Sequence, residues 1–197
     1  MHKRHFIPSI MILITILVLS ACNQGIDTSS WEKFTIQESP GFDIEFLVPP
    51  DWETNYLLPM ETAPGQWKVI LRPPRCSSDQ SADYEEDCIT LTAYVKGEAA
   101  FEEDEVLALI SQNISLSQEN NAESILMGQS SFDVNGLTIQ RFDHKIPSAT
   151  GDVQLSYYFF QTDNAYYTIM ADFPYDERED RTAEQFQRVL QSITIAE

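Results

Sequence analysis

The feature that most constrains the fold is an alternation of apolar and polar residues that returns along most of the chain. In "FDIEFLV" (42–48), Ile44, Phe46 and Val48 share one face, while acidic residues occupy the other. Such alternation predicts a strand with one buried face. The turn dipeptides Asn135-Gly136 and Asp163-Asn164 separate later strands. We expect a mostly antiparallel sheet of seven or eight strands. The other predicted strands include 67–72, 89–95, 124–128, 134–142, 153–163 and 165–173.

Two segments change to the period of a helix. Val106 and Ile110 belong to an apolar stripe within 101–117, where acidic residues in the first turn suit the helix dipole. Thr182 and Gln185 form a capping box that opens a second helix. Strands combined with one mid-chain and one C-terminal helix predict an α+β fold. The apolar stripe of the second helix is Phe186, Val189, Leu190 and Ile193.

The segment "IEFLVPPDW" (44–52) resembles the opening of PsbP-like proteins, and "YYTIMADF" with "FQRVLQSITI" is similar to their last strand and helix. The resemblance covers roughly residues 31–195. It implies an α/β/α sandwich, in which a central, mostly antiparallel sheet has helices on both faces. The family is not known as an enzyme family, and its photosynthetic members help to assemble the oxygen-evolving centre and retain its ions. None of their metal-binding histidines can be carried over, so the fold alone assigns no photosystem role.

The N-terminus has the pattern of an exported lipoprotein. After the basic start "MHKRH", the segment 6–21 has no charge, and its 16 residues are fewer than the roughly 20 needed to span a membrane. "LSAC" resembles the lipobox of bacterial lipoproteins, which implies cleavage before Cys22 and acylation of its thiol. We predict a signal peptide at 1–21, a lipidated tether at 22–30 and one globular domain at 31–197. An uncleaved signal anchor is the alternative.

The predicted cellular location and the net charge of the chain limit the classes of partner that it can bind. Acyl chains on Cys22 would hold the domain on the extracytoplasmic face of a bacterial membrane, facing the periplasm or on the outer membrane in a double-membraned cell. Loss of Lys3 and Arg4 leaves 10 basic residues against 31 acidic ones, a formal charge of −21. This charge argues against nucleic acid as a partner. It suits a soluble exported protein, or one that attracts cations or a basic partner.

Cys76 and Cys88 are the two cysteines that remain. Outside the cytoplasm such a pair is normally oxidised, so we predict a disulfide that closes a loop of about 13 residues and contributes roughly 3 kcal/mol. Two unpaired thiols or a metal site are the alternatives, although CxxC spacing is absent and no histidine lies nearby. Asp79, Asp83 and Glu85 between them are candidate oxygen ligands for Ca²⁺. No EF-hand frame is present, and a solvated acidic loop explains the same residues.

No catalytic set of residues stands out. His144 is the sole histidine after the predicted signal peptide, and we expect it at the surface near a strand end. No GxSxG motif is present to expose a nucleophile. A hydrolase that uses paired carboxylates stays open, because 31 acidic residues always form pairs.

The run "SYYFFQTDNAYY" (156–167) is strongly aromatic. Alternation places Tyr157 and Phe159 on one face and Tyr158 and Phe160 on the other. A sheet covered on both sides would bury both pairs, whereas an exposed patch would serve a protein or an apolar ligand.

The sequence thus favours a lipid-anchored accessory module that acts by contact with a protein partner of unknown identity, without catalysis. The first alternative is a divalent-cation or small-ligand binder that uses the acidic 76–88 segment, with Ca²⁺ as the only candidate cofactor. The second alternative is a carboxylate-based hydrolase.

Overall fold

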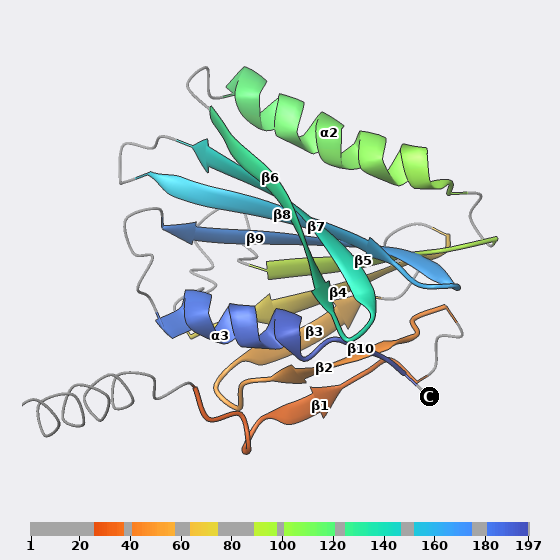
Figure 1. Ribbon diagram of the computed structural model, residues 1–197, viewed down its shortest axis with the longest axis vertical. Coiled ribbons are helices and arrows are strands. Elements are labelled where there is room, and N and C mark those ends of the chain that lie inside the picture. Colours follow the sequence, from red (N-terminus) through yellow and green to blue (C-terminus); the bar gives the residue numbers. More distant parts are fainter. Residues whose placement is uncertain are drawn as a thin grey trace, which may run out of the picture.

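The computed structural model describes residues 26–37, 41–57, 64–74, 89–97, 101–120, 125–146, 152–174 and 181–196. These residues form an α+β fold (Figure 1). The helices are α2 (Glu103–Asn120) and α3 (Arg181–Gln191). The strands are β1 (Glu32–Phe34), β2 (Ile44–Val48), β3 (Glu53–Leu57), β4 (Gln66–Arg72), β5 (Ile89–Val95), β6 (Ile125–Val134), β7 (Leu137–Ile146), β8 (Val153–Gln161), β9 (Ala165–Pro174) and β10 (Thr194–Ile195).

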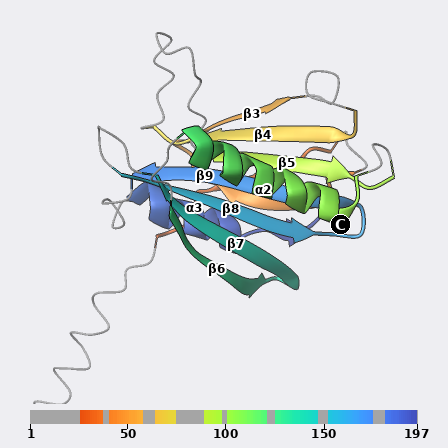
Figure 2. The ribbon, with the colours of Figure 1, turned by 90° about the horizontal axis from the view of Figure 1, so that it is seen from above.

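Seven of these strands form one antiparallel sheet in the order β3-β4-β5-β9-β8-β7-β6, so that β3 and β6 are its two edges (Figure 2). The turns at Asn135-Gly136 and Asp163-Asn164 join β6 to β7 and β8 to β9, as predicted. Asn135 has a φ of 48° and Gly136 a φ of 87°, the left-handed conformation that this type of turn needs at both positions.

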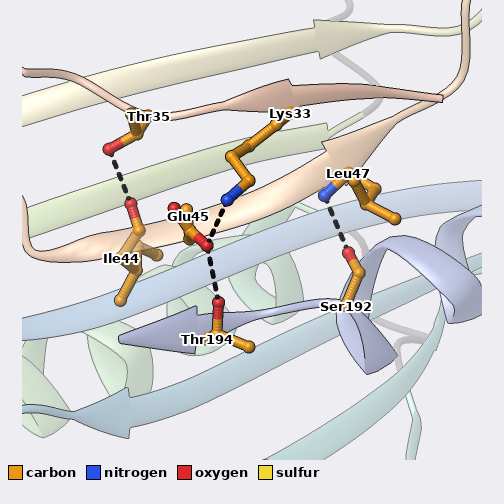
Figure 3. A network of polar contacts seen from close by, with 7 residues as sticks. All are labelled: Lys33, Thr35, Ile44, Glu45, Leu47, Ser192 and Thr194. Carbon is orange, nitrogen blue, oxygen red and sulfur yellow. Dashed lines mark hydrogen bonds and ion pairs between the residues drawn. The ribbon is translucent and has the colours of Figure 1, made fainter. Parts of the chain in front are cut away.

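The remaining three strands form a small sheet in the order β1-β2-β10. The Lys33 ammonium lies 2.7 Å from Glu45 Oε1 across β1 and β2, and the Thr194 hydroxyl donates to the same oxygen at 3.4 Å (Figure 3). The Leu47 N–H donates to Ser192 Oγ at 2.8 Å. The Ser192 contact ties β2 to the end of α3, and it places the C-terminal segment against the N-terminal strands.

The two helices cover opposite faces of the large sheet, because their apolar residues belong to different cores. The larger core includes Phe186, Val189 and Leu190 of α3 and the buried residues of the small sheet. The second core contains Val106 and Ile110 of α2. One face of the large sheet therefore packs against α2, and the other packs against α3 and the small sheet together.

The aromatic run on β8 divides between these two cores as alternation predicted. Tyr158 and Phe160 lie in the larger core, and Tyr157 and Phe159 lie in the second one. All four side chains are buried. The prediction of burial on both faces is therefore confirmed, and the run forms no exposed aromatic patch.

Three predictions about single elements were wrong. The described residues contain ten strands, because β1 and β3 are strands that the alternation did not indicate. The last helix begins at Arg181, so that Thr182 lies within its first turn, where its side chain is buried. The segment between 128 and 134 is also extended, so that β6 is one continuous strand of 10 residues.

A partly buried junction joins the segment before β2 to the β8–β9 turn. Asp43 accepts hydrogen bonds from the Tyr167 hydroxyl at 2.7 Å, the Thr162 hydroxyl at 2.8 Å and the Asn164 amide at 2.9 Å. Burial, and then the nearby Asp43 carboxylate, raise the pKa of Tyr167 well above its ordinary value, so its hydroxyl stays protonated and donates.

Replacement of Asp43 by alanine is expected to lower the free energy of unfolding by about 1–3 kcal/mol, because the buried hydroxyls of Tyr167 and Thr162 would lose their shared acceptor. Urea denaturation of the purified protein measures this change. Glu53→Ala is the matched control, since it also removes one carboxylate but from an exposed position. Equal midpoints for the two variants would contradict a structural role for the Asp43 junction.

Candidate functional site

The predicted site residues lie outside the described part of the chain. These are the lipidation site Cys22, the cysteines Cys76 and Cys88 of the proposed disulfide, and the acidic candidates Asp79, Asp83 and Glu85. Lipidation, disulfide formation and cation binding therefore stay predictions. The described residues offer a different candidate site, at the edge of the large sheet.

The strand β6 forms an open edge of this sheet. It pairs with β7 on one side, and no strand or backbone group among the described residues pairs with its other side. Every residue from Ile125 to Ser131 is exposed. Ile125 and Leu126 are each 55% exposed and Met127 is 46% exposed. Only two other large apolar side chains in the described residues are exposed, so these three form a cluster.

The chemistry of β6 does little to protect this edge. Natural edge strands are usually short, or carry charges or proline that discourage pairing with another chain. The opposite edge, β3, has five residues and an exposed Glu53. In contrast, β6 has ten residues, and Asp133 is its only charged side chain. The edge strand β6 is therefore longer and less charged than β3, and it is the more suitable of these two edges for pairing with an incoming strand.

A register shift interrupts β6 between Leu126 and Gly128. Such a bulge disturbs the ladder locally and ends regular pairing. From Gly128 to Val134 the pairing with β7 is regular. A Cβ atom added to Gly128 would meet nothing within 4 Å, so the space beside this glycine is open. Regular pairing at the edge can therefore begin at Gly128, and a neighbouring side chain would find room there.

The strand behind the edge is held firmly in place. Asp143 Oδ1 on β7 accepts hydrogen bonds from Arg141 Nε at 2.8 Å, Ser156 Oγ at 2.6 Å and Gln154 Nε2 at 3.3 Å. The Arg141 guanidinium also lies 5.7 Å from the centre of the Tyr158 ring. These contacts tie β7 to β8 on the face that α3 covers. They give β6 a rigid support.

The prediction that His144 lies at the surface was wrong. This residue is only 2% exposed, and its strand continues to Ile146. His144 stands between Leu126 of β6 and Leu155 of β8 in the register, and neither ring nitrogen has a hydrogen-bond partner. Burial lowers the pKa of His144, while the Asp143 carboxylate acts in the opposite direction. The imidazole is therefore neutral at pH 7, and its register partners in the sheet, Leu126 and Leu155, are both apolar.

We expect the stability of the protein to fall as the pH drops below about 6.5, the ordinary pKa of histidine. Because the pKa of His144 is lowered in the folded state, the unfolded chain takes up the proton first, and the stabilisation is lost as the pH falls through the folded value. His144→Leu should show a smaller loss. Denaturation in urea at pH 7.5, 6.5 and 5.5 compares the two proteins. Identical pH slopes would rule out this contribution, since carboxylates act equally in both.

A shallow hollow lies where β1, the end of β2 and the start of β3 meet. Its volume is about 280 Å³, near the lower limit of about 300 Å³ for small-molecule sites. The Trp52 indole N–H beside it is buried without a hydrogen-bond partner. Lys33 and Glu32 add charges of both signs. The other lining residues are Phe34, Val48, Pro49, Pro50 and Thr54.

Two classes of site are absent from the part of the chain that the structure describes. No three side chains of the types His, Cys, Asp and Glu come together there in a group that could hold a metal ion. Neither helix in that part combines the length and the apolar composition that crossing a bilayer requires.

The sequence reasoning missed the β6 edge because its signal is weak. The segment "ILMGQSSF" (125–132) has neither the alternation of a half-buried strand nor the apolar content of a buried one. Its one signal is the absence of charge over eight residues in an otherwise acidic chain.

Comparisons with known proteins bear on the fold. No protein-family model and no curated protein matches the sequence. The solution structure of cyanobacterial PsbP from Synechocystis sp. PCC 6803 is similar with a TM-score of 0.53 at 13% identity, covering 87% of this chain and 95% of that one. The crystal structure of LpqN from Mycobacterium tuberculosis is similar with a TM-score of 0.50 at 13% identity, covering 86% and 93%. At this identity the likeness concerns the fold alone, and it confirms the predicted resemblance to it.

Proposed function

This chain has a PsbP-like fold, and we propose that it is a lipid-anchored extracytoplasmic accessory module that acts by protein–protein contact. It performs no catalysis of its own, and its contact surface is the open edge of β6. The observation that carries this proposal is the exposure of Ile125, Leu126 and Met127 on a strand of ten residues whose outer side pairs with no described strand.

Strand addition is the binding mode that this surface supports. An open edge presents backbone N–H and C=O groups that an extended segment of another protein can satisfy, and alternate side chains then provide specificity. The three exposed apolar residues add area that a partner would remove from water, at about 25 cal/mol per Å². The contacts that Asp143 makes hold β7 behind the edge, so little conformational entropy is lost when a partner binds.

The proposals of a lipid anchor and of an extracytoplasmic location are supported by the sequence. Acylation of Cys22 after removal of residues 1–21 would tie the domain at 31–197 to a membrane, with a disulfide between Cys76 and Cys88 in an oxidising compartment. LpqN, whose fold is similar, is described as involved in cell envelope biogenesis, which supports an envelope address. Coverage of the large sheet by α2 on one face and α3 on the other supports an α/β/α sandwich of the PsbP type.

A photoreactive amino acid at Met127 tests this function in the full-length protein in its native membrane. Irradiation is expected to give a covalent adduct of higher mass on a denaturing gel. The adduct should disappear in a Gln129→Lys, Ser131→Lys variant, because two charges on an edge strand oppose pairing with another chain. Both substitutions are at exposed positions and should leave the fold intact.

The matched control carries the same photoreactive group at Gln112, an exposed position on helix α2 and not on the edge strand β6. This site should give no comparable adduct. If Met127 and Gln112 label equally, or if Met127 gives no adduct, the edge of β6 is not the contact surface.

A further inference from the structure

We propose that the strand that pairs with the edge of β6 is the β6 strand of a second copy of this chain, antiparallel and centred on Ser130. This inference deepens the proposed function, on which it rests, by naming the partner. It would join the two large sheets, each with β6 at its edge, into one continuous sheet.

The faces of β6 determine which registers are possible. In the pairing with β7, Gly128, Ser130 and Phe132 face the α3 side of the sheet. Gln129 and Ser131 face the α2 side. A two-fold axis perpendicular to the sheet keeps each face on its own side, and directly opposed residues share a face. One residue of β6 must therefore stand directly opposite the same residue of the second copy, with the axis midway between the two.

An axis through Ser130 gives five directly opposed pairs between the copies. Ser130 meets Ser130, Gln129 meets Ser131 and Gly128 meets Phe132, with the last two pairs repeated by symmetry. The polar pairs place hydroxyl and amide groups within reach of each other across the strands. The regular part of β6 begins at Gly128, directly after the register shift, so that the bulge lies outside these five pairs.

Gly128 and Phe132 are complementary in this arrangement. The space beside Gly128 is open, since an added Cβ would meet nothing within 4 Å. Phe132 is only half-buried and packs with one side against the larger core. Placing an aromatic ring over a glycine on the neighbouring strand removes exposed backbone from water, and designed sheets use the same pairing. The second copy therefore covers both the free side of Phe132 and the bare backbone of Gly128.

The charges permit this contact despite the net charge of −19 of the chain. Asp133, the only charge on β6, stands opposite Met127 of the other copy and not opposite the second Asp133. The two carboxylates are then six residue positions apart along the strand, about 20 Å at 3.3 Å per residue. This distance is about two and a half times the Debye length of roughly 8 Å at physiological salt. Repulsion between these two groups is therefore screened.

The contact area indicates where the dimer forms. Five strand pairs with the flanking Ile125, Leu126 and Met127 make a contact well below the 1,200–2,000 Å² or so of a stable interface. Free in dilute solution, the two copies would associate weakly. A shared membrane surface confines lipid-anchored copies and raises their effective concentration, which strengthens a weak contact without any new interaction.

Cysteine substitutions in the full-length, membrane-bound protein test the register. In Ser130→Cys, the two opposed Cα atoms would lie about 4.5–5.5 Å apart, within the range that a disulfide requires. In Ser131→Cys, the two cysteines would be offset by two residues, about 8 Å apart, which is too far. After brief mild oxidation, Ser130→Cys should give a dimer on a non-reducing gel at least about tenfold faster than Ser131→Cys. The wild type measures the background from the native cysteines.

The two proposals fail in different ways. Two differently tagged copies carrying the photoreactive group at Met127 should give an adduct with both tags. An adduct with one tag and the mass of another protein would overturn the second-copy inference, while the proposed function would stand. Absence of both the adduct and the Ser130→Cys dimer would overturn both. A dimer that forms equally fast through Ser131→Cys would overturn the register. Unchanged thermal midpoints show that the variants are folded.

Discussion

Phe186→Ala is expected to lower the free energy of unfolding by about 3–5 kcal/mol, because truncation of a fully buried phenylalanine removes its apolar contacts and leaves a cavity. Phe186 is 1% exposed, and its ring meets Tyr158 edge-on with 5.6 Å between the ring centres. Tyr158 belongs to β8, so this contact joins α3 to the large sheet. Chemical denaturation of the purified protein measures the change in free energy.

Arg188→Ala is the matched control on the same helix. The Arg188 side chain is exposed and, within the described ranges, donates only to Gln191 Oε1 at 2.9 Å. Its removal should therefore change the stability by no more than about 0.5 kcal/mol. Phe186→Leu should fall between the two, because leucine keeps much of the apolar volume. If Phe186→Ala costs as little as Arg188→Ala, α3 does not pack on the sheet as described.

Strands buried on both faces were the easiest part of the fold to predict from the sequence. The predicted strand 89–95 matches β5 at both ends. The strands β8 and β9 were predicted from dense aromatic and aliphatic runs between turn residues. Burial on both faces demands apolar side chains at nearly every position, which leaves a continuous pattern in the sequence. The helix stripes were visible for the same reason, since one face of each helix enters a core.

Strands that gain little from burial were not predictable in this way. The strand β3 reads "ETNYL", and its side chains are exposed or half-buried. It is extended because its backbone pairs with β4, from Glu53 opposite Arg72 to Leu57 opposite Lys68. The short strand β1 likewise owes its conformation to pairing with β2. Pairing depends on which strand lies alongside, and local periodicity does not carry that information.

The candidate site was hidden for a related reason. Whether a strand is at an edge depends on the strand order, and the segment that became β6 showed only an absence of charge. The burial of His144 was not predicted, because charged residues flank it in "RFDHKI" (141–146) and this pattern is typical of an exposed strand end. In the sheet, alternation places Arg141 and Asp143 on one face and His144 on the other, where Leu155 and Leu126 flank it.

Gly41→Ala is expected to lower the free energy of unfolding by about 3 kcal/mol, because the added methyl group would overlap the side chain of Val95. A Cβ atom on Gly41 would lie 2.9 Å from Val95 Cβ and still closer to both of its Cγ atoms. Gly41 and Val95 are both buried, so neither can move into solvent. The thermal midpoint should fall by roughly 6–12 °C at 2–4 °C per kcal/mol.

Gly128→Ala separates the effect of overlap from the general effect of losing a glycine. The space beside Gly128 is open and its φ is not positive, so alanine there should change the stability by about 0.5 kcal/mol at most.

A double-mutant cycle of Gly41→Ala and Val95→Ala then tests whether Val95 is the residue that the new methyl group overlaps. Val95→Ala alone should destabilise by leaving a cavity, but in the Gly41→Ala background it removes the clash and admits the new methyl group. The two substitutions should therefore couple favourably by about 1 kcal/mol or more. Strict additivity would mean that Gly41 is not packed against Val95, and that the segment before β2 does not lie against β5.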